Sequence, residues 1–175
     1  MSPKWRVFLA TVLAVLVLDQ ATKAYAYLSI AYMSGRVTVI PGLFDLVHRQ
    51  NPGATMGLLA DSPHRLVVFY AFTAVAVVLA VGFQWVLEPA ERFVSAMSGM
   101  ILGGALGNLI DRVHKGTVTD LLRFYTDDPD RVAWLHRHGL PPEYPTFNVA
   151  DASLVVGVLL FVALYPFSGA RADED

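Results

Sequence analysis

Long stretches without charged residues dominate the pattern of this chain. Residues 66–87, 93–110 and 152–170 contain no Asp, Glu, Lys or Arg. A helix that crosses a membrane needs roughly 20 largely apolar residues. The pattern therefore predicts three membrane-crossing helices, and only 16% of all residues are charged, where a soluble domain has about a quarter.

A fourth apolar stretch, residues 7–18, is followed by Asp19 and Lys23. It has two interpretations. The basic "SPKWR", the apolar stretch and the small residues of "AYA" at 24–26 resemble a secretory signal peptide. However, Asp19 and Lys23 are polar at the point where an apolar signal segment should end. We therefore favour a retained first helix.

The sequence thus predicts an all-α membrane protein with four transmembrane helices, at about 5–27, 65–87, 92–114 and 148–167. Between the first two, "RVTVI" and "LFDLVH" are short strand-like segments separated by Pro41-Gly42. We expect a small β-rich segment on the membrane surface, at about 36–58. A loop at about 115–145 should join the last two helices, and residues 1–175 should form a single integral membrane domain.

Composition excludes several classes of function. The net charge of −2 gives no indication of nucleic-acid binding. The absence of cysteine excludes disulfides, thiolate catalysis and cysteine metal sites. His136 and His138 are two residues apart, which would place them on different faces of a helix, so we interpret them as loop histidines. We expect no metal and no cofactor.

Two clusters of polar residues lie within the predicted helices. In "DQATK", Asp19 precedes Lys23 by four residues, the favourable order for an ion pair on one helix face. A structural ion pair is the simpler interpretation, and a contact to substrate is the alternative. In "GMILGGALGNLIDR", small residues recur every four positions, which allows another helix to approach closely; these are Gly99, Gly103 and Gly107.

A row of polar positions lies next to these glycines, at Gly104, Asn108 and Arg112, with Asp111 beside it. An arginine there can hold carboxylates through paired hydrogen bonds. An internal structural network is the alternative.

Two aspartates are candidates for catalysis. Asn148 and Asp151 open the last helix and resemble a capping pair. Asp120 lies in an extended-looking stretch after the third helix. Both aspartates should lie at one membrane face together with Asn51. Two carboxyl groups so close cannot both ionise, so one could activate water while the other polarises a carbonyl group.

In order along the chain, five motifs resemble those of the lipoprotein signal peptidases, or signal peptidase II family, which are bacterial membrane aspartyl endopeptidases. The motifs are "DQATK" (19–23), "NPGATMG" (51–57), "GGALGNLIDR" (103–112), "VTD" (118–120) and "FNVADASL" (147–154). Five motifs in the family's order make the resemblance specific. It implies an enzyme that cuts a prolipoprotein before its lipid-modified cysteine.

The resemblance also implies roles for individual residues. Asp120 and Asp151 would be the catalytic pair. The residues that support the site or hold substrate would be Asp19, Lys23, Asn51, Gly53, Gly104, Asn108, Arg112 and Asn148. The protein would lie in the bacterial inner membrane as a monomer among lipids, with its site at the outer face and its termini in the cytoplasm. The basic residues alone indicate the opposite orientation, with four on the terminal side and nine on the other.

This chain departs from the family's pattern in three places. Leu121 and Met56 stand where the family usually has aromatic residues, and the interval between the two aspartates is longer. We expect the added segment, about 127–145, to cover the site, because both of its ends lead to a catalytic aspartate. A plain surface loop is the alternative.

Two functions other than a peptidase remain open at this point. Acidic residues inside a membrane are typical of a small proton- or ion-coupled transporter. A non-catalytic scaffold could use the glycine row as its docking surface.

Overall fold

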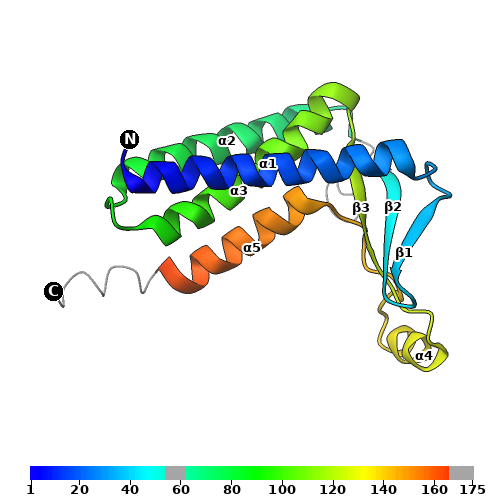
Figure 1. Cartoon of the computed structure of the whole chain (residues 1–175). Helices are drawn as coiled ribbons and strands as arrows, with labels where there is room; N and C mark the ends of the chain where they lie inside the picture. Colours follow the sequence, from blue (N-terminus) through cyan, green and yellow to red (C-terminus); the bar gives the residue numbers. More distant parts are fainter. Residues whose placement is uncertain (54–61, 166–175) are drawn as a thin grey trace.

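The computed structural model describes residues 1–53 and 62–165. Its long helices are α1 (Pro3–Ser29), α2 (Arg65–Val86), α3 (Arg92–Lys115) and α5 (Val149–Leu164). They lie side by side, and α3 packs against the other three (Figure 1). The start of α1 and the end of α5 lie at the same end of this bundle, and a small sheet lies at the opposite end. The predicted helices are confirmed within two or three residues, and the end of the last one, 166–167, lies outside the described residues.

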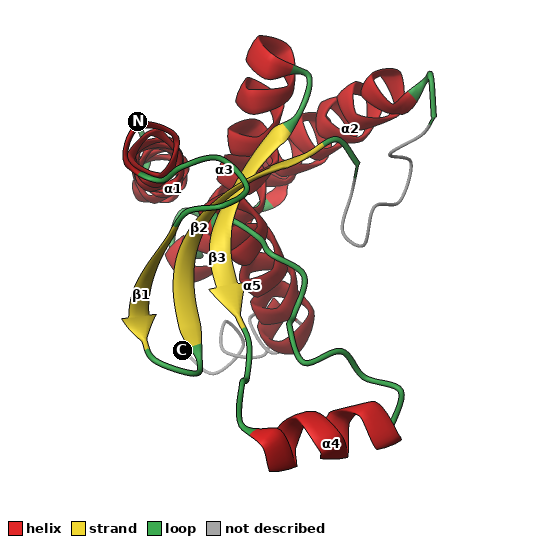
Figure 2. Ribbon diagram, turned by 90° about the vertical axis from the view of Figure 1, so that its right-hand side faces the viewer, coloured by secondary structure: helices red, strands yellow, loops and turns green. Residues whose placement is uncertain are grey.

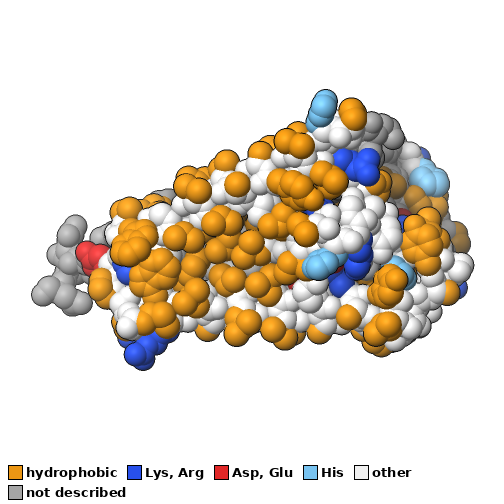
Figure 3. All heavy atoms as spheres, turned by 90° about the horizontal axis from the view of Figure 1, so that it is seen from above, with side chains coloured by type: hydrophobic (Ala, Val, Ile, Leu, Met, Phe, Trp, Pro, Cys, Tyr) orange, Lys and Arg blue, Asp and Glu red, His pale blue; other side chains and the backbone are white. Residues whose placement is uncertain are grey.

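Three of the described helices, α1, α2 and α3, are long and apolar enough to cross a membrane. The described part of α5 has 16 residues and is also strongly apolar. Hydrophobic side chains spread over the middle of the face seen in Figure 3, and Lys and Arg side chains lie toward its two ends. This distribution is typical of a surface that faces lipid between two aqueous boundaries.

The row of glycines on α3 forms the contact with α1, as its spacing predicts. A Cβ at Gly99 would lie 2.9 Å from the carbonyl oxygen of Phe8, and one at Gly103 would lie 2.8 Å from Cβ of Val15. Both distances are shorter than a normal contact. The two helices therefore pack backbone against backbone, in the way that small residues allow in membranes.

The sheet has three antiparallel strands in the order β1 (Arg36–Ile40), β2 (Phe44–Asn51) and β3 (Val118–Phe124). The first two are the predicted strand segments. The third corrects our prediction, because it comes from a region that we expected to be a loop. Leu121 explains why β3 forms there: it is buried against Ala26 and Ile30 at the end of α1. The predicted β-rich segment extended to residue 58, of which 54–58 lie outside the described residues.

The prediction of a loop at about 115–145 is also wrong for residues 129–137, which form helix α4 (Pro129–Arg137). Asp128 caps this helix by accepting a hydrogen bond from the Arg131 backbone at 2.9 Å, and proline at the first helical position is favourable. His136 lies in the last turn of the helix, so it is not a loop histidine. The ring of His138, just after the helix, lies 4.2 Å from the ring of Trp134.

Helix α4 lies at the far end of the sheet and runs crosswise to the bundle, as Figures 1 and 2 show. None of its residues is buried. The added segment reaches the candidate site only at its exit, where Tyr144 and Pro145 line the pocket described below. The structure therefore gives α4 no position from which to cover that pocket.

We expect a chain in which 129–138 are replaced by a short Gly/Ser linker to keep its catalytic efficiency within about twofold, because surface segments away from a site contribute little. The activity that the resemblance implies and the thermal unfolding would be measured on both proteins. Glu143 is retained because it bonds Arg49 at 2.7 Å and Arg123 at 2.8 Å. A large loss of turnover with unchanged stability would show that α4 acts on the site after all.

Candidate active site

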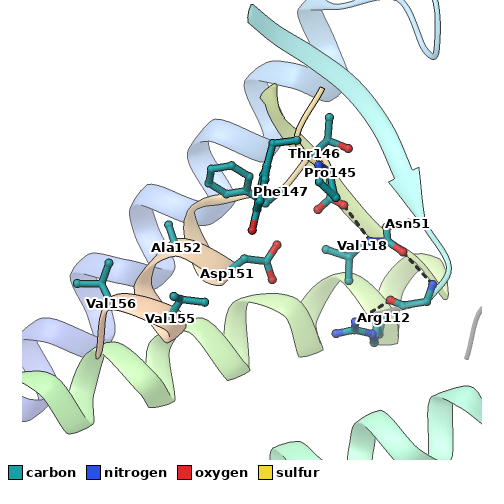
Figure 4. Close-up of a pocket in the computed structure, with 13 residues that line it drawn as sticks. Asn51, Arg112, Val118, Pro145, Thr146, Phe147, Asp151, Ala152, Val155 and Val156 are labelled. Atoms are coloured by element: carbon teal, nitrogen blue, oxygen red, sulfur yellow. Dashed lines mark hydrogen bonds between the residues drawn. The ribbon is translucent and has the colours of Figure 1, made fainter. Parts of the chain in front are cut away.

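A pocket of about 320 Å³ lies where the sheet meets α3 and α5, and both candidate aspartates line it. Asp120 comes from β3, and Asp151 comes from the first turn of α5. Figure 4 shows the Asp151 side chain pointing into the pocket, with Asn51 and Arg112 across from it. The structure thus brings together residues that are far apart in the sequence, as predicted.

Asn148 connects the two aspartates. Its side-chain Nδ2 donates to Oδ1 of Asp120 at 2.9 Å, and its backbone N–H donates to Oδ2 of Asp151 at 3.2 Å. Its Oδ1 also accepts from the Asp151 backbone at 2.9 Å, which completes a capping box at the start of α5. The capping interpretation is therefore confirmed, and the same residue positions both carboxyl groups.

Two further asparagines donate hydrogen bonds to the carboxyl groups of Asp120 and Asp151. Asn51 Nδ2 donates to Oδ2 of Asp120 at 3.0 Å. Asn108 Nδ2 donates to Oδ1 of Asp151 at 2.7 Å, and its own Oδ1 accepts from Asn148 at 3.1 Å. Each carboxyl group therefore has a fixed position, because hydrogen bonds reach it from two different elements.

Burial, and next the neighbouring Asp151 carboxylate, raise the pKa of Asp120 from 3.8 to about 7. The hydrogen bonds from Asn51 and Asn148 act in the opposite direction. The pair can therefore hold one proton near neutral pH. A carboxylate beside a carboxylic acid is an arrangement that can both accept and donate a proton.

The raised pKa of Asp120 predicts a pH-dependent stability. Between about pH 4 and pH 7 the folded protein keeps a proton on Asp120 that the unfolded chain has lost. The contribution of this residue to the free energy of unfolding must therefore fall as the pH rises through that window. We expect the stability of the wild type relative to Asp120→Asn to be lower at pH 7.5 than at pH 4.5, as measured by unfolding in detergent.

The matched control is Asp130→Asn, on the exposed surface of α4. It should shift the stability equally at the two pH values. A stability difference between wild type and Asp120→Asn that does not change with pH would contradict the raised pKa.

Lys23 on α1 is joined to α3 and, through Asn108, to Asp151. Its Nζ lies 2.8 Å from Asp19 and 3.4 Å from Asp111, and it donates to Oδ1 of Asn108 at 3.1 Å. Only 1% of Lys23 is exposed, and it does not line the pocket. The predicted ion pair is present, and its position favours a structural role over a contact to substrate.

The partners of Lys23 extend this network to the elements that carry the aspartates. Asp19 accepts from the backbone of Ala150 at 2.9 Å, which ties α1 to the first turn of α5. Asp111 accepts from the backbone of Thr119 at 2.8 Å, next to Asp120. Asp19 and Asp111, which both pair with Lys23, therefore fix the backbone next to Asp151 and next to Asp120.

Arg112 and Gly53 lie on the opposite wall of the pocket. Arg112 donates to the carbonyl oxygen of Gly53 at 3.3 Å, and its guanidinium group lies 3.9 Å from the centre of the Phe69 ring. Gly53 in turn donates to Oδ1 of Asn51 at 2.9 Å. Arg112 thus holds the end of β2, and with it Asn51, against α3.

Gly104 does not line the pocket. A Cβ there would collide with the carbonyl oxygen of Ala150 and lie 3.0 Å from Leu154. Its role in the structure is to let α5 approach α3, and the geometry gives it no direct contact with a molecule in the pocket.

Sequence reasoning missed the apolar walls of the pocket: Val118, residues 144–147, Ala152, Val155 and Val156. Within an apolar chain, nothing in the pattern distinguishes these positions from lipid-facing ones. In the described residues, no group of histidine, aspartate or glutamate side chains is arranged to hold a metal ion.

Comparisons with known proteins support one family. The family model for Signal peptidase (SPase) II matches residues 11–167. A lipoprotein signal peptidase of Geobacter sulfurreducens is 41% identical over 162 residues, covering 91% of each chain. Another, of Nitratidesulfovibrio vulgaris, is 39% identical over 169 residues, covering 94% of this chain and 93% of that protein.

Two solved structures of bacterial membrane enzymes share the fold. The first has a TM-score of 0.75 at 25% identity and covers 96% of this chain and 92% of its own. The second has a TM-score of 0.70 at 26% identity and covers 89% and 90%.

Proposed function

This chain belongs to the signal peptidase II family, and we propose that Asp120 and Asp151 are the pair of carboxyl groups with which it removes signal peptides from prolipoproteins. The observation that carries this proposal is the position of Asn148. It bonds both aspartates, at 2.9 and 3.2 Å, within one pocket. Family membership supports a bacterial multi-pass membrane peptidase, and the assignment of the aspartic mechanism rests on this geometry.

In the proposed mechanism, the pair shares one proton. The ionised carboxylate, Asp151, removes a proton from a water molecule, which attacks the carbonyl carbon of the scissile peptide bond. Asp120, protonated near neutral pH, donates its proton toward the carbonyl oxygen. The tetrahedral intermediate then breaks at the C–N bond. The amine leaves with the proton that Asp151 had taken, and a hydroxyl group of the intermediate returns a proton to Asp120. The products are a new carboxylate on the signal peptide and a free amino group on the lipid-modified cysteine.

A separate apolar groove, which shares no lining residue with the pocket, is suited to the membrane-embedded part of the substrate. It has a volume of about 430 Å³ and is lined by side chains from α2, α3 and α5, among them Phe72, Leu79 and Ile101. Phe83 closes it against α5, because its ring lies 5.2 Å from that of Phe161. We propose that this groove holds the apolar helix of the signal peptide, while the peptide bond lies at the carboxyl groups.

The proposed topology has four membrane-crossing helices, with α5 as the fourth, and both termini in the cytoplasm. The described part of α5 rises about 24 Å, somewhat less than the roughly 30 Å of a hydrocarbon core. Asp151 lies in its first turn, so the pocket would lie at the outer boundary of the inner membrane.

We expect a cysteine placed at Ser2 to be protected from a membrane-impermeant thiol reagent in intact cells, and one at Ser34 to react. Ser2 precedes α1, and Ser34 lies between α1 and β1, at the end of the bundle that carries the sheet. The absence of natural cysteines means that only the introduced thiol is labelled. The reverse pattern would place the site in the cytoplasm and contradict the proposed topology.

The transporter alternative has less support. Its prediction was acidic residues at several depths of the membrane, whereas Asp120 and Asp151 share one pocket at one end of the bundle. The comparisons identify peptidases, and the glycine row that a scaffold would need for docking is covered by α1.

The proposed function is tested with purified protein and a prolipoprotein whose cysteine carries its lipid. We expect cleavage before that cysteine, with both products identified by mass spectrometry. The same precursor without the lipid is the control and should react more slowly, because it lacks the acyl chains that hold it at the membrane. Cleavage elsewhere in the chain, or no cleavage, would contradict the proposal.

A further inference from the structure

A second polar cavity, which we call the arginine cavity, lies on the sheet beside the end of α1. It has a volume of about 190 Å³ and shares no lining residue with the catalytic pocket. Three of its lining residues are arginines, Arg36 on β1, Arg49 on β2 and Arg123 on β3, and His48 and the turn at 33–35 complete it. Each of the three strands thus contributes one arginine to the lining of this small space.

The acidic neighbours do not neutralise these arginines. Arg123 donates to Asp45 at 2.9 Å and to Glu143 at 2.8 Å, and Arg49 donates to the same Glu143 at 2.7 Å. Arg36 is exposed and forms no ion pair with any residue in the described ranges. Three positive charges therefore face two negative ones.

Two hydrogen-bond contacts hold the ring of His48 in the wall of the cavity. Its Nδ1 lies 3.2 Å from the carbonyl oxygen of Ile30, which can only accept, so Nδ1 carries the proton. Its Nε2 lies 3.2 Å from the amide nitrogen of Gln50, from which it accepts. The surplus of one positive charge is counted on the three arginines alone.

One donor in this cluster is buried without an acceptor. Nε of Arg123 has no hydrogen-bond partner among the residues that the structure describes. The same guanidinium group is fixed by its two carboxylates and lies 4.2 Å from the centre of the Tyr125 ring, so it cannot turn to find one. The two carboxylates therefore leave part of the hydrogen-bonding capacity of this guanidinium group unused.

The position of the cavity indicates where such an anion comes from. The turn at 33–35 follows α1, and the sheet lies at the end of the membrane-crossing helices (Figures 1 and 2). Tyr27 and Tyr32, both about half exposed, flank this end of α1, as aromatic residues do at a membrane interface. Phosphate groups of lipids lie at this depth, and arginine is suited to bind them through several hydrogen bonds.

We propose that the arginine cavity binds a phosphate group, as it occurs in a phospholipid headgroup or as free phosphate. Bound phosphate accepts from Arg36 and lies beside Arg49 and Arg123, whose guanidinium groups add positive charge. It thereby fastens the sheet to the membrane surface. Arg49 lies directly opposite Asp120 in the register of β2 and β3, so the strands that the phosphate fixes are those that carry half of the catalytic pair.

The test compares the wild type with Arg36→Gln, and Arg131→Gln is the matched control. Arg36 forms no ion pair with the described residues, so its loss should not disturb folding. Arg131 is an exposed arginine of α4 that does not line the cavity. Thermal unfolding would be followed in nanodiscs of phosphatidylglycerol and of a phosphate-free galactolipid. Binding of inorganic phosphate would be followed in phosphate-free detergent by ³¹P line broadening.

We expect phosphatidylglycerol to raise the melting temperature of the wild type and of Arg131→Gln, and Arg36→Gln to lose most of that rise. The affinity of Arg36→Gln for inorganic phosphate should be about tenfold lower than that of the wild type, since a hydrogen bond between charged groups is lost. Binding of inorganic phosphate without a lipid effect would identify free phosphate as the ligand. Equal losses in both variants would show diffuse attraction between charges, and no phosphate effect in either experiment would overturn the proposal. Neither result depends on peptidase activity.

Discussion

Asp120→Asn and Asp151→Asn should each lower the turnover of lipidated prolipoprotein by a factor on the order of 10³, because each removes one of the two groups that must exchange a proton with water and substrate. The proton is shared, so the pair acts as a unit, and the double variant should be hardly slower than either single one. Single-turnover rates with purified protein would measure this.

The control separates loss of chemistry from loss of fold. An asparagine at 151 can still accept from Asn108 and an asparagine at 120 can still accept from Asn148, so both variants should remain folded by thermal unfolding. Asp111→Asn alters a third buried aspartate, which does not line the pocket. It should lower the melting temperature of the protein, while the fraction that remains folded keeps most of its turnover. Near-normal cleavage by Asp151→Asn would overturn the assignment of the pair.

Lys23→Met should destabilise the protein by about 3–5 kcal/mol, the cost of leaving a buried charge without its partner. Asp19 is fully buried and would keep its charge beside an apolar methionine, and Asp111 would lose one of its two lysines. Unfolding in detergent would measure the loss.

The double change Asp19→Leu with Lys23→Met tests the physical reason. It removes both members of the pair, and Asp111 keeps Lys115 at 3.5 Å. We expect it to recover part of the stability lost in the single variant, although Ala150 loses its acceptor. A Lys23→Met protein with unchanged stability and a greatly raised KM would instead show that the lysine contacts substrate.

The helices could be predicted from the sequence because membrane-crossing segments must be apolar over a fixed length. The spacing of Gly99, Gly103 and Gly107 also predicted a close helix contact, and α1 is the helix that makes it. The role of Asn148 as a cap was readable because the local spacing to Asp151 determines that geometry. These predictions depend on neighbours in sequence.

The third strand and α4 could not be predicted in the same way. Strand β3 forms because β2 is available as a partner and because Leu121 can be buried against α1, which are contacts across long separations. Helix α4 has nine residues, too few for a clear apolar period. The apolar walls of the pocket were missed because Val155 and Val156 resemble any other lipid-facing residue of α5.

The central claim is that a pair of carboxyl groups activates water for direct attack on the peptide bond. One turnover with enzyme in excess, carried out in water enriched in ¹⁸O, tests this claim most directly. We predict that the new carboxylate of the released signal peptide contains one ¹⁸O atom after that first turnover, as mass spectrometry would show. A first-turnover product without ¹⁸O would mean that an oxygen of the enzyme was transferred, and would contradict the account.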